Sequence, residues 1–216
     1  MAQQTEGPPH HIRLMGRAVN GTVARAPWLW PVLKAPVRRY FDGLAHGWDE
    51  RTGAGTVDHL TALATAVTHV EAEPERVLDL GTGTGVAALF LAREYPRASI
   101  RGVDFSEEMV ATAKAKVGLD PEGRIAFKVA DAASLPFADD SFDLVAQVNV
   151  PPFLAELARV LRPGGYAVFV ASGGPATPFY TPPSVLERGL AKRGIETVAS
   201  DAAGRGTYLV GRAARG

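Results

Sequence analysis

A chain of 216 residues is long enough for one domain with a well-buried core and short for two. Lys plus Arg and Asp plus Glu number 23 each, so no overall charge favours nucleic acid as a partner. The absence of cysteine excludes disulfides, thiolate nucleophiles and cysteine-ligated metal sites. The N-terminus lacks the apolar segment of a signal peptide, and no run of about 18 apolar residues occurs. We therefore expect a cytoplasmic protein with no membrane span.

The first 41 residues differ in charge from the rest of the chain. They carry six basic side chains and one acidic side chain, whereas residues 42–203 carry 14 basic and 22 acidic ones. Residues 1 to about 27 show no sustained periodicity, and the prolines within residues 28–41 are expected to divide that apolar segment into short turns. We interpret residues 1–40 as an N-terminal helical arm or lid and residues 41–216 as one domain.

From residue 57 the chain alternates between helix and strand patterns. Apolar residues recur at helical spacing from Val57, and Pro74 is expected to end that helix. Strand patterns then cover residues 76–80, 98–104, 124–130, 142–150 and 165–172. Helix patterns fall between them, at residues 86–95, between the predicted caps Ser106 and Gly118, and at residues 153–161.

This order predicts the fold. Strictly alternating strands and helices need right-handed crossovers, which build a doubly wound parallel sheet. Residues 194–200 and 207–213 flank a glycine-bearing turn and predict an antiparallel hairpin at one edge. The expected fold is therefore α/β, with a Rossmann-like, mostly parallel sheet of seven strands and a C-terminal antiparallel hairpin.

The loop after the first strand, DLGTGTG (residues 79–85), is the first candidate binding site. Ligands of such sheets bind beyond the carboxyl ends of the strands, and alternate glycines let a ligand approach bare main chain. The segment GTGVAA from Gly83 also satisfies the Gly-x-Gly-x-x-Ala pattern of dinucleotide binding, and Asp104 follows 21 residues later. An NAD(P)-dependent oxidoreductase is therefore an alternative, although no Tyr-x-x-x-Lys pair occurs in the chain.

Four segments together resemble a known family. VLDLGTGTG (77–85), GVDFSEEMV (102–110), VADAASLPFADDSFDLV (129–145) and LARVLRPGGYAVFV (157–170) are similar, in order and spacing, to the motifs of class I S-adenosylmethionine-dependent methyltransferases. The resemblance covers about residues 40–172, and the family's terminal hairpin would account for residues 194–213. It implies S-adenosylmethionine as the cofactor.

The resemblance also implies roles for individual residues. Asp79 would attract the cofactor's amino group, Asp104 would accept both ribose hydroxyls, and Asp131 would accept from the adenine amino group. Aromatic residues before the first strand close over the cofactor in small-molecule members of the family. The expected cofactor-binding residues are Tyr40, Trp48, Asp79, Gly81, Thr82, Gly83, Gly85, Asp104, Phe105, Met109, Asp131, Ala132 and Asn149.

The sequence says less about the substrate site than about the cofactor site. Asn149 lies beside the expected methyl position, but Val150 separates it from Pro151 and Pro152, so the Asn-Pro-Pro grip of amine methyltransferases is not carried over. The prolines suit the first turn of the following helix. Because the loop between the fourth strand and this helix is short, other segments must form the wall over the substrate. We expect the arm and residues 172–183 to form it. Candidate general bases, if the acceptor must lose a proton, are His46, Asp49, Glu50, His59 and Tyr180.

The sequence thus predicts methyl transfer to a small-molecule acceptor, with a lipophilic acceptor as one option. The alternatives are the oxidoreductase and a non-catalytic S-adenosylmethionine-binding protein. No metal site and no nucleic-acid partner are expected, and the oligomeric state stays open. The basic, aromatic residues 28–41 predict either a lid over the acidic body or contact with an anionic membrane surface through Trp28, Trp30, Leu33 and Phe41.

Overall fold

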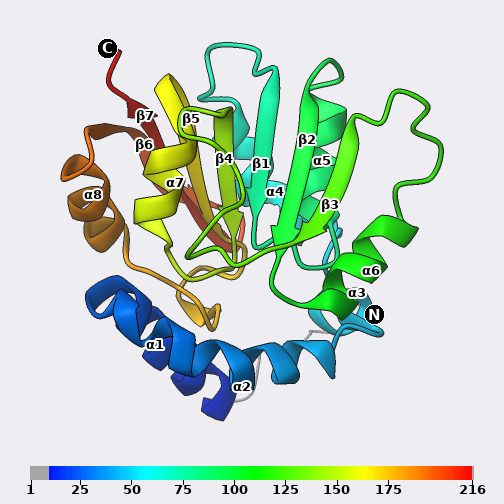
Figure 1. Cartoon of the computed structure of the whole chain (residues 1–216). Coiled ribbons are helices and arrows are strands. Elements are labelled where there is room, and N and C mark those ends of the chain that lie inside the picture. The colour runs from blue at the N-terminus through cyan, green and yellow to red at the C-terminus, as the bar shows by residue number, and fades with distance from the viewer. Residues whose placement is uncertain (1–9, 216) are drawn as a thin grey trace.

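The computed structural model describes residues 10–215 and contains one seven-stranded sheet in the order β3-β2-β1-β4-β5-β7-β6 (Figure 1). Five strands are parallel, and β7 pairs antiparallel with β5 and β6. The doubly wound sheet and its terminal hairpin are therefore confirmed. The strands are β1 (Arg76–Leu80), β2 (Ser99–Asp104), β3 (Ile125–Val129), β4 (Phe142–Val148), β5 (Leu161–Ala171), β6 (Ile195–Ala203) and β7 (Gly206–Ala213).

The central strands are apolar because both faces of the sheet are covered. Val77, Leu78 and Leu80 of β1 are fully buried, as are Leu144 and Val145 of β4. Alternate residues face opposite sides, so Val77 and Leu144 belong to one core cluster and Leu78 and Val145 to the other. The apolar runs in the sequence thus reflect strands that are buried on both faces, each face against its own core cluster.

Helices complete each core. One face of the sheet is covered by α4 (Val57–Val67), α5 (Val86–Glu94) and α6 (Glu107–Ala115), and the other by α7 (Leu154–Val160) and α8 (Pro183–Ala191). The predicted cap at Ser106 is present, since its hydroxyl accepts a hydrogen bond from the Met109 N–H at 3.2 Å. None of the helices within residues 10–215 is long and apolar enough to cross a bilayer.

The arm consists of two helices that cross the carboxyl edge of the sheet, α1 (His10–Arg25) and α2 (Trp30–Asp42), joined by a short 3₁₀ turn (Figure 1). The expectation of short turns in residues 28–41 is wrong. Pro31 lies in the first turn of α2, where its missing N–H is not needed, and only Pro36 lies inside the helix. Burial of Trp30 and Val37 against the body offsets the hydrogen bond that Pro36 removes.

Two further differences concern helix ends. The helix predicted from residue 57 ends at Val67, well before Pro74, in a capping turn where the Thr68 N–H donates to the Thr65 carbonyl oxygen at 3.2 Å. The helix after β4 begins at Leu154, so Pro151 and Pro152 precede it instead of forming its first turn. In addition, α8 was not predicted, because it is too short to show a clear apolar period, whereas α3 (Trp48–Thr52) lies within residues 40–53, which resemble the family's helix before the first strand.

Candidate functional site

A cavity of about 130 Å³ opens at the carboxyl ends of β1, β2 and β4. Ligands of doubly wound sheets bind at this edge, near the point where the strand order switches direction. Here that point lies between β1 and β4. Ten of the thirteen residues expected from the sequence line the cavity, and Tyr40, Gly85 and Asp131 do not. The ten are Trp48, Asp79, Gly81, Thr82, Gly83, Asp104, Phe105, Met109, Ala132 and Asn149.

The glycine loop forms the floor of the cavity. The Gly81 and Thr82 N–H groups donate to the Val103 carbonyl oxygen at 2.8 and 2.9 Å, which ties the loop to β2. Gly83 has φ +53°, and a Cβ placed there would meet no atom within 4 Å, so its main chain is bare toward open space. Gly85 instead packs against Ala113, where a Cβ would lie 2.9 Å from the alanine methyl group. The loop therefore presents main chain to a ligand mainly at Gly83.

Two carboxylates face this loop, and both are short of positive partners. Asp79 is 1 % exposed; its Oδ2 accepts from the Thr82 hydroxyl at 2.6 Å, while its Oδ1 has no partner among the described residues. The Oδ atoms of Asp104 accept from the N–H groups of Gly83 and Ser106, each at 2.9 Å. Burial raises the pKa of each carboxyl to about 6, against the lowering effect of these hydrogen bonds.

The charge balance of the cavity follows from its lining. Among the described residues, no Lys or Arg lines it, and its only ionisable side chains are Asp79, Asp104 and His59. Two buried carboxylates without a cation favour a positively charged ligand, because its charge would compensate for the water that burial removed. The same setting suits a ligand that donates hydrogen bonds to the free Oδ1 of Asp79.

The wall on the β2 side is apolar, as expected for an aromatic ring. Phe105 and Met109 line it together with Ala130 and Ala132. Asp131 points elsewhere: its Oδ1 accepts from the Trp30 indole N–H at 2.8 Å, and its Oδ2 lies 3.0 Å from the Lys34 ammonium. The carboxylate expected to meet an adenine thus ties α2 to the loop that follows β3.

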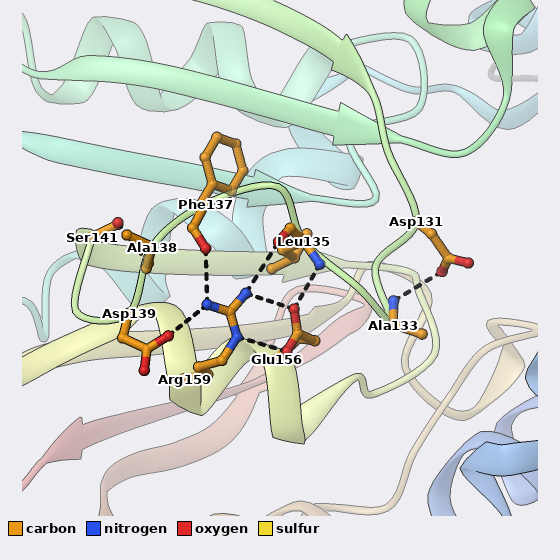
Figure 2. A network of polar contacts seen from close by, with 9 residues as sticks. All are labelled: Asp131, Ala133, Leu135, Phe137, Ala138, Asp139, Ser141, Glu156 and Arg159. Atoms are coloured by element: carbon orange, nitrogen blue, oxygen red, sulfur yellow. Dashed lines mark hydrogen bonds and ion pairs between the residues drawn. The ribbon is translucent and has the colours of Figure 1, made fainter.

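That loop, residues 131–141, is held from below by α7. Figure 2 shows the Arg159 guanidinium donating to the carbonyl oxygens of Leu135 and Phe137, at 3.1 and 2.8 Å, and to Asp139. Glu156 pairs with the same guanidinium at 2.7 Å and accepts from the Leu135 N–H at 2.6 Å. These bonds lower the pKa of Glu156 and raise that of Arg159. The pair fixes the loop that carries Ala132 to the cavity wall.

An aromatic cluster closes the cavity from the arm side. Phe41 of α2 lies at its centre, with ring centroids 5.6 Å from Trp48, 6.3 Å from Phe105 and 5.9 Å from Phe179. Phe41, and not the neighbouring Tyr40, lines the cavity. Trp30, Val37 and Phe41 share one face of α2, a spacing that only a continuous helix reveals.

The short helix α3 is anchored to the glycine loop through Asp49. Its Oδ1 accepts from the Thr84 hydroxyl at 2.6 Å, and its Oδ2 pairs with the Lys116 ammonium, which also donates to the Thr84 carbonyl oxygen at 2.9 Å. Trp48 precedes Asp49 and is held over the cavity by this anchor. Asp49 is thus committed to a structural contact rather than free to act as a base.

Asn149 lines the cavity, and both polar atoms of its amide bond to Ser172. Its Nδ2 donates to the Ser172 hydroxyl and its Oδ1 accepts from the Ser172 N–H, both at 2.8 Å. These bonds hold Asn149 in a left-handed conformation, φ +57°, that few residues other than glycine adopt. Val150 beside it, which was not predicted, covers the glycine loop, because a Cβ on Gly81 would lie 2.3 Å from its Cγ1.

Of the five candidate bases, only His59 lines the cavity within the described part of the chain. Burial lowers its pKa below the usual value, and the nearby Asp49 opposes this effect. A neutral imidazole can accept a proton, so His59 is chemically suited to that role. No group of three or more His, Asp or Glu residues among those described is placed to hold a metal ion.

Comparisons with known proteins bear on what binds here. A family profile described as a methyltransferase domain matches residues 77–165. The chain is 45 % identical over 112 residues to the ubiquinone/menaquinone biosynthesis C-methyltransferase UbiE of Geobacter sulfurreducens, covering 48 % of this chain and 44 % of that protein. It is 37 % identical over 122 residues to phthiotriol/phenolphthiotriol dimycocerosates methyltransferase 1 of Mycobacterium ulcerans, covering 52 % of this chain and 43 % of that protein.

A solved structure shares the fold. One chain of the complex between the Haloferax volcanii Trm112 methyltransferase activator and a methyltransferase superposes with a TM-score of 0.66 at 23 % identity, over 81 % of this chain and 98 % of that one. By contrast, the chain spans about half the length of the curated relatives it matches. The matched segments include the glycine loop, both buried carboxylates and the loop held by Arg159.

Proposed function

We propose that this chain is a class I methyltransferase that transfers a methyl group from S-adenosylmethionine to a small lipophilic acceptor, supported by the methyltransferase-domain profile that matches residues 77–165. The observation that carries the proposal is the pair of buried carboxylates, Asp79 and Asp104, beside the bare main chain of Gly83 in a cavity without Lys or Arg among its described residues.

The residues present fit the cofactor. The free Oδ1 of Asp79 would accept from its amino group, and Asp104 would accept from its ribose hydroxyls. Phe105, Met109 and Ala132 would contact the adenine ring. When bound, S-adenosylmethionine supplies a methyl group on a sulfonium, which an acceptor can displace in line. The carboxylates would favour this cation over a neutral or anionic ligand.

The protein's own part is to orient the reactants and exclude water. Holding the acceptor atom near the methyl carbon accounts for something like 7–11 kcal/mol of barrier in such reactions. Trp30, Phe41 and Phe179 close the cavity on the arm side and provide an apolar wall for the acceptor. Where the acceptor is a hydroxyl or carbon acid, His59, which lines the cavity, would take its proton.

A lipophilic acceptor is supported by two observations. Beyond the cofactor-facing residues, the cavity is lined by apolar side chains such as Val150, which covers the glycine loop, and Phe153. The names of the matched relatives refer to quinone biosynthesis and to phthiotriol dimycocerosates. Lipophilic hydroquinones and phenols are therefore the first acceptors to try.

Two measurements test the proposal. Isothermal titration with S-adenosylmethionine and with NAD should show binding of the first only; binding of NAD alone would favour the oxidoreductase. Transfer of a radiolabelled methyl group to a panel of hydroquinones, phenols and lipophilic amines should then give an organic-extractable product. Cofactor binding with no transfer to any member would favour a non-catalytic binding protein.

A further inference from the structure

The apolar side chains of the arm form two sets, one buried against the body and one exposed. Trp30 and Val37 are buried against the body, and Leu33 and Phe41 pack on the same core cluster. Trp28 and Val32, in contrast, are 72 % and 73 % exposed. The residues expected from the sequence to contact a membrane are thus divided: Trp30 and Phe41 line the cavity, Leu33 packs on the core, and Trp28 is exposed.

The exposed set extends onto α1. Five of the nine large apolar side chains that are exposed in the described structure belong to the arm: Leu14, Met15, Trp28, Leu29 and Val32. We call these five residues the outer face. Several large apolar side chains exposed on neighbouring elements, with basic residues around them, are typical of a surface that contacts a protein or a membrane.

Contacts of α1 with the body explain why this face points away from it. Asn20 Nδ2 donates to the Thr181 hydroxyl at 3.0 Å, and Gly16 lies so close to Pro178 that a Cβ would meet its carbonyl oxygen at 2.5 Å. Val19 and Val23 are buried on the same side of the helix. By the periodicity of the helix, Leu14 lies on the opposite side and Met15 lies at the edge of the buried side; both are exposed.

Charge identifies the kind of surface that would cover the outer face. Residues 10–42 contain six basic side chains and one acidic side chain, Asp42, although the chain as a whole is neutral. Arg25 and Arg39 are exposed and form no ion pair with another described residue. Lys34 and Arg38 pair with Asp131 and Asp42 but keep about half of their side-chain surface exposed. A protein partner would need a matching acidic patch, whereas an anionic bilayer offers negative charge and an apolar interior together.

We propose that the outer face of α1 and α2 binds the surface of an anionic lipid bilayer, with Trp28, Leu29 and Val32 inserted and the surrounding arginines at the headgroups. One of these helices, α2, also supplies Trp30, Val37 and Phe41 to the cavity wall, so the bound protein holds its cavity next to the lipid. Delivery of a lipophilic acceptor from the bilayer rests on the proposed function, whereas membrane binding does not.

Co-sedimentation of the full chain with vesicles tests this inference. Binding is expected to vesicles of phosphatidylcholine with phosphatidylglycerol, to weaken with salt, and to be weak with phosphatidylcholine alone. The double variant Trp28→Ser/Val32→Ser should bind about tenfold more weakly or worse, because serine brings little apolar surface into the bilayer. Arg25→Gln/Arg39→Gln should also weaken binding, by about 25-fold, because each basic residue near an anionic surface contributes roughly a fivefold factor.

A matched control lies elsewhere on the chain. Val57 and Leu119 are 83 % and 101 % exposed and lie outside the arm, so Val57→Ser/Leu119→Ser should bind vesicles like the parent. Calorimetric binding of S-adenosylmethionine reports whether each variant retains its fold. If the parent binds vesicles but not S-adenosylmethionine, the proposed function fails and the membrane inference stands.

Three results would overturn the inference. One is no sedimentation of the parent with anionic vesicles. A second is an equal loss of binding in the control variant. The third is a concentration-dependent dimer, seen by analytical ultracentrifugation, that Trp28→Ser/Val32→Ser abolishes while vesicle binding is absent, which would assign the outer face to a second copy of the chain.

Discussion

The sharpest prediction concerns the effect of pH on cofactor affinity. In the ligand-free protein, burial raises the pKa of Asp79 and of Asp104 to about 6. Bound S-adenosylmethionine would place a cation and hydrogen-bond donors against these carboxylates, which lowers both pKa values toward the ordinary range. The bound state therefore holds fewer protons than the free state between about pH 4 and pH 6, and affinity must rise with pH across this window.

The size of the effect follows from the pKa values. A carboxyl whose pKa falls from about 6 to about 4 on binding makes affinity roughly tenfold weaker near pH 5 than near pH 8. If Asp79 and Asp104 both respond, the loss approaches about a hundredfold, or nearly 3 kcal/mol. The affinity for S-adenosylmethionine reaches its full value above about pH 7 and decreases as the pH falls through 6.

Titration calorimetry across this pH range measures the effect directly, and proton uptake or release can be read from buffers of different ionisation enthalpy. Asp104→Asn cannot titrate, so it should remove about half of the logarithmic pH dependence as well as lowering affinity at high pH. Asp58→Asn replaces an exposed carboxylate on α4 and should keep the full dependence. Equal affinity near pH 5 and near pH 8 in the parent would refute the assignment of both carboxylates to the ligand.

Three further substitutions probe the surroundings of the cavity. Gly81→Ala adds a clash with Val150 to the strain of a positive φ, so thermal denaturation should show a loss of about 2–4 kcal/mol, whereas Gly83→Ala, which has a positive φ but open space around it, should lose only about 1–2 kcal/mol. Equal losses would contradict the packing argument. Arg159→Lys keeps the charge but removes the fork that holds loop 131–141, and should lower both the melting temperature and S-adenosylmethionine affinity; unchanged affinity would show that the loop does not shape the site. Trp30→Phe removes the indole donor and should speed tryptic cleavage within the arm, and an unchanged rate would show that this bond does not hold the arm closed.

Much of the body could be predicted from sequence because its signals are local. The strands around Leu78 and Val145 are covered on both faces, so they read as continuous apolar runs. The glycine loop and Asp104 each follow directly from a strand end, and parallel strands bring their carboxyl ends to one edge whatever their exact packing. Short-range pattern and topology were therefore sufficient to place Asp79, Gly83 and Asp104 at the cavity.

The arm and the rim were decided by contacts between residues far apart in the chain. Asp131 is drawn from the cavity by Trp30, 101 residues away, and the Asn149 amide is satisfied by Ser172, 23 residues away. No local pattern records such pairings, because they depend on where helices and loops settle on the finished sheet. The sequence by itself thus determined the sheet and the carboxylates at its edge. Only the tertiary structure decided that Phe41 rather than Tyr40 faces the cavity and that Trp28 stays outside, since the face a residue presents depends on the continuous helix around it and on what that helix packs against.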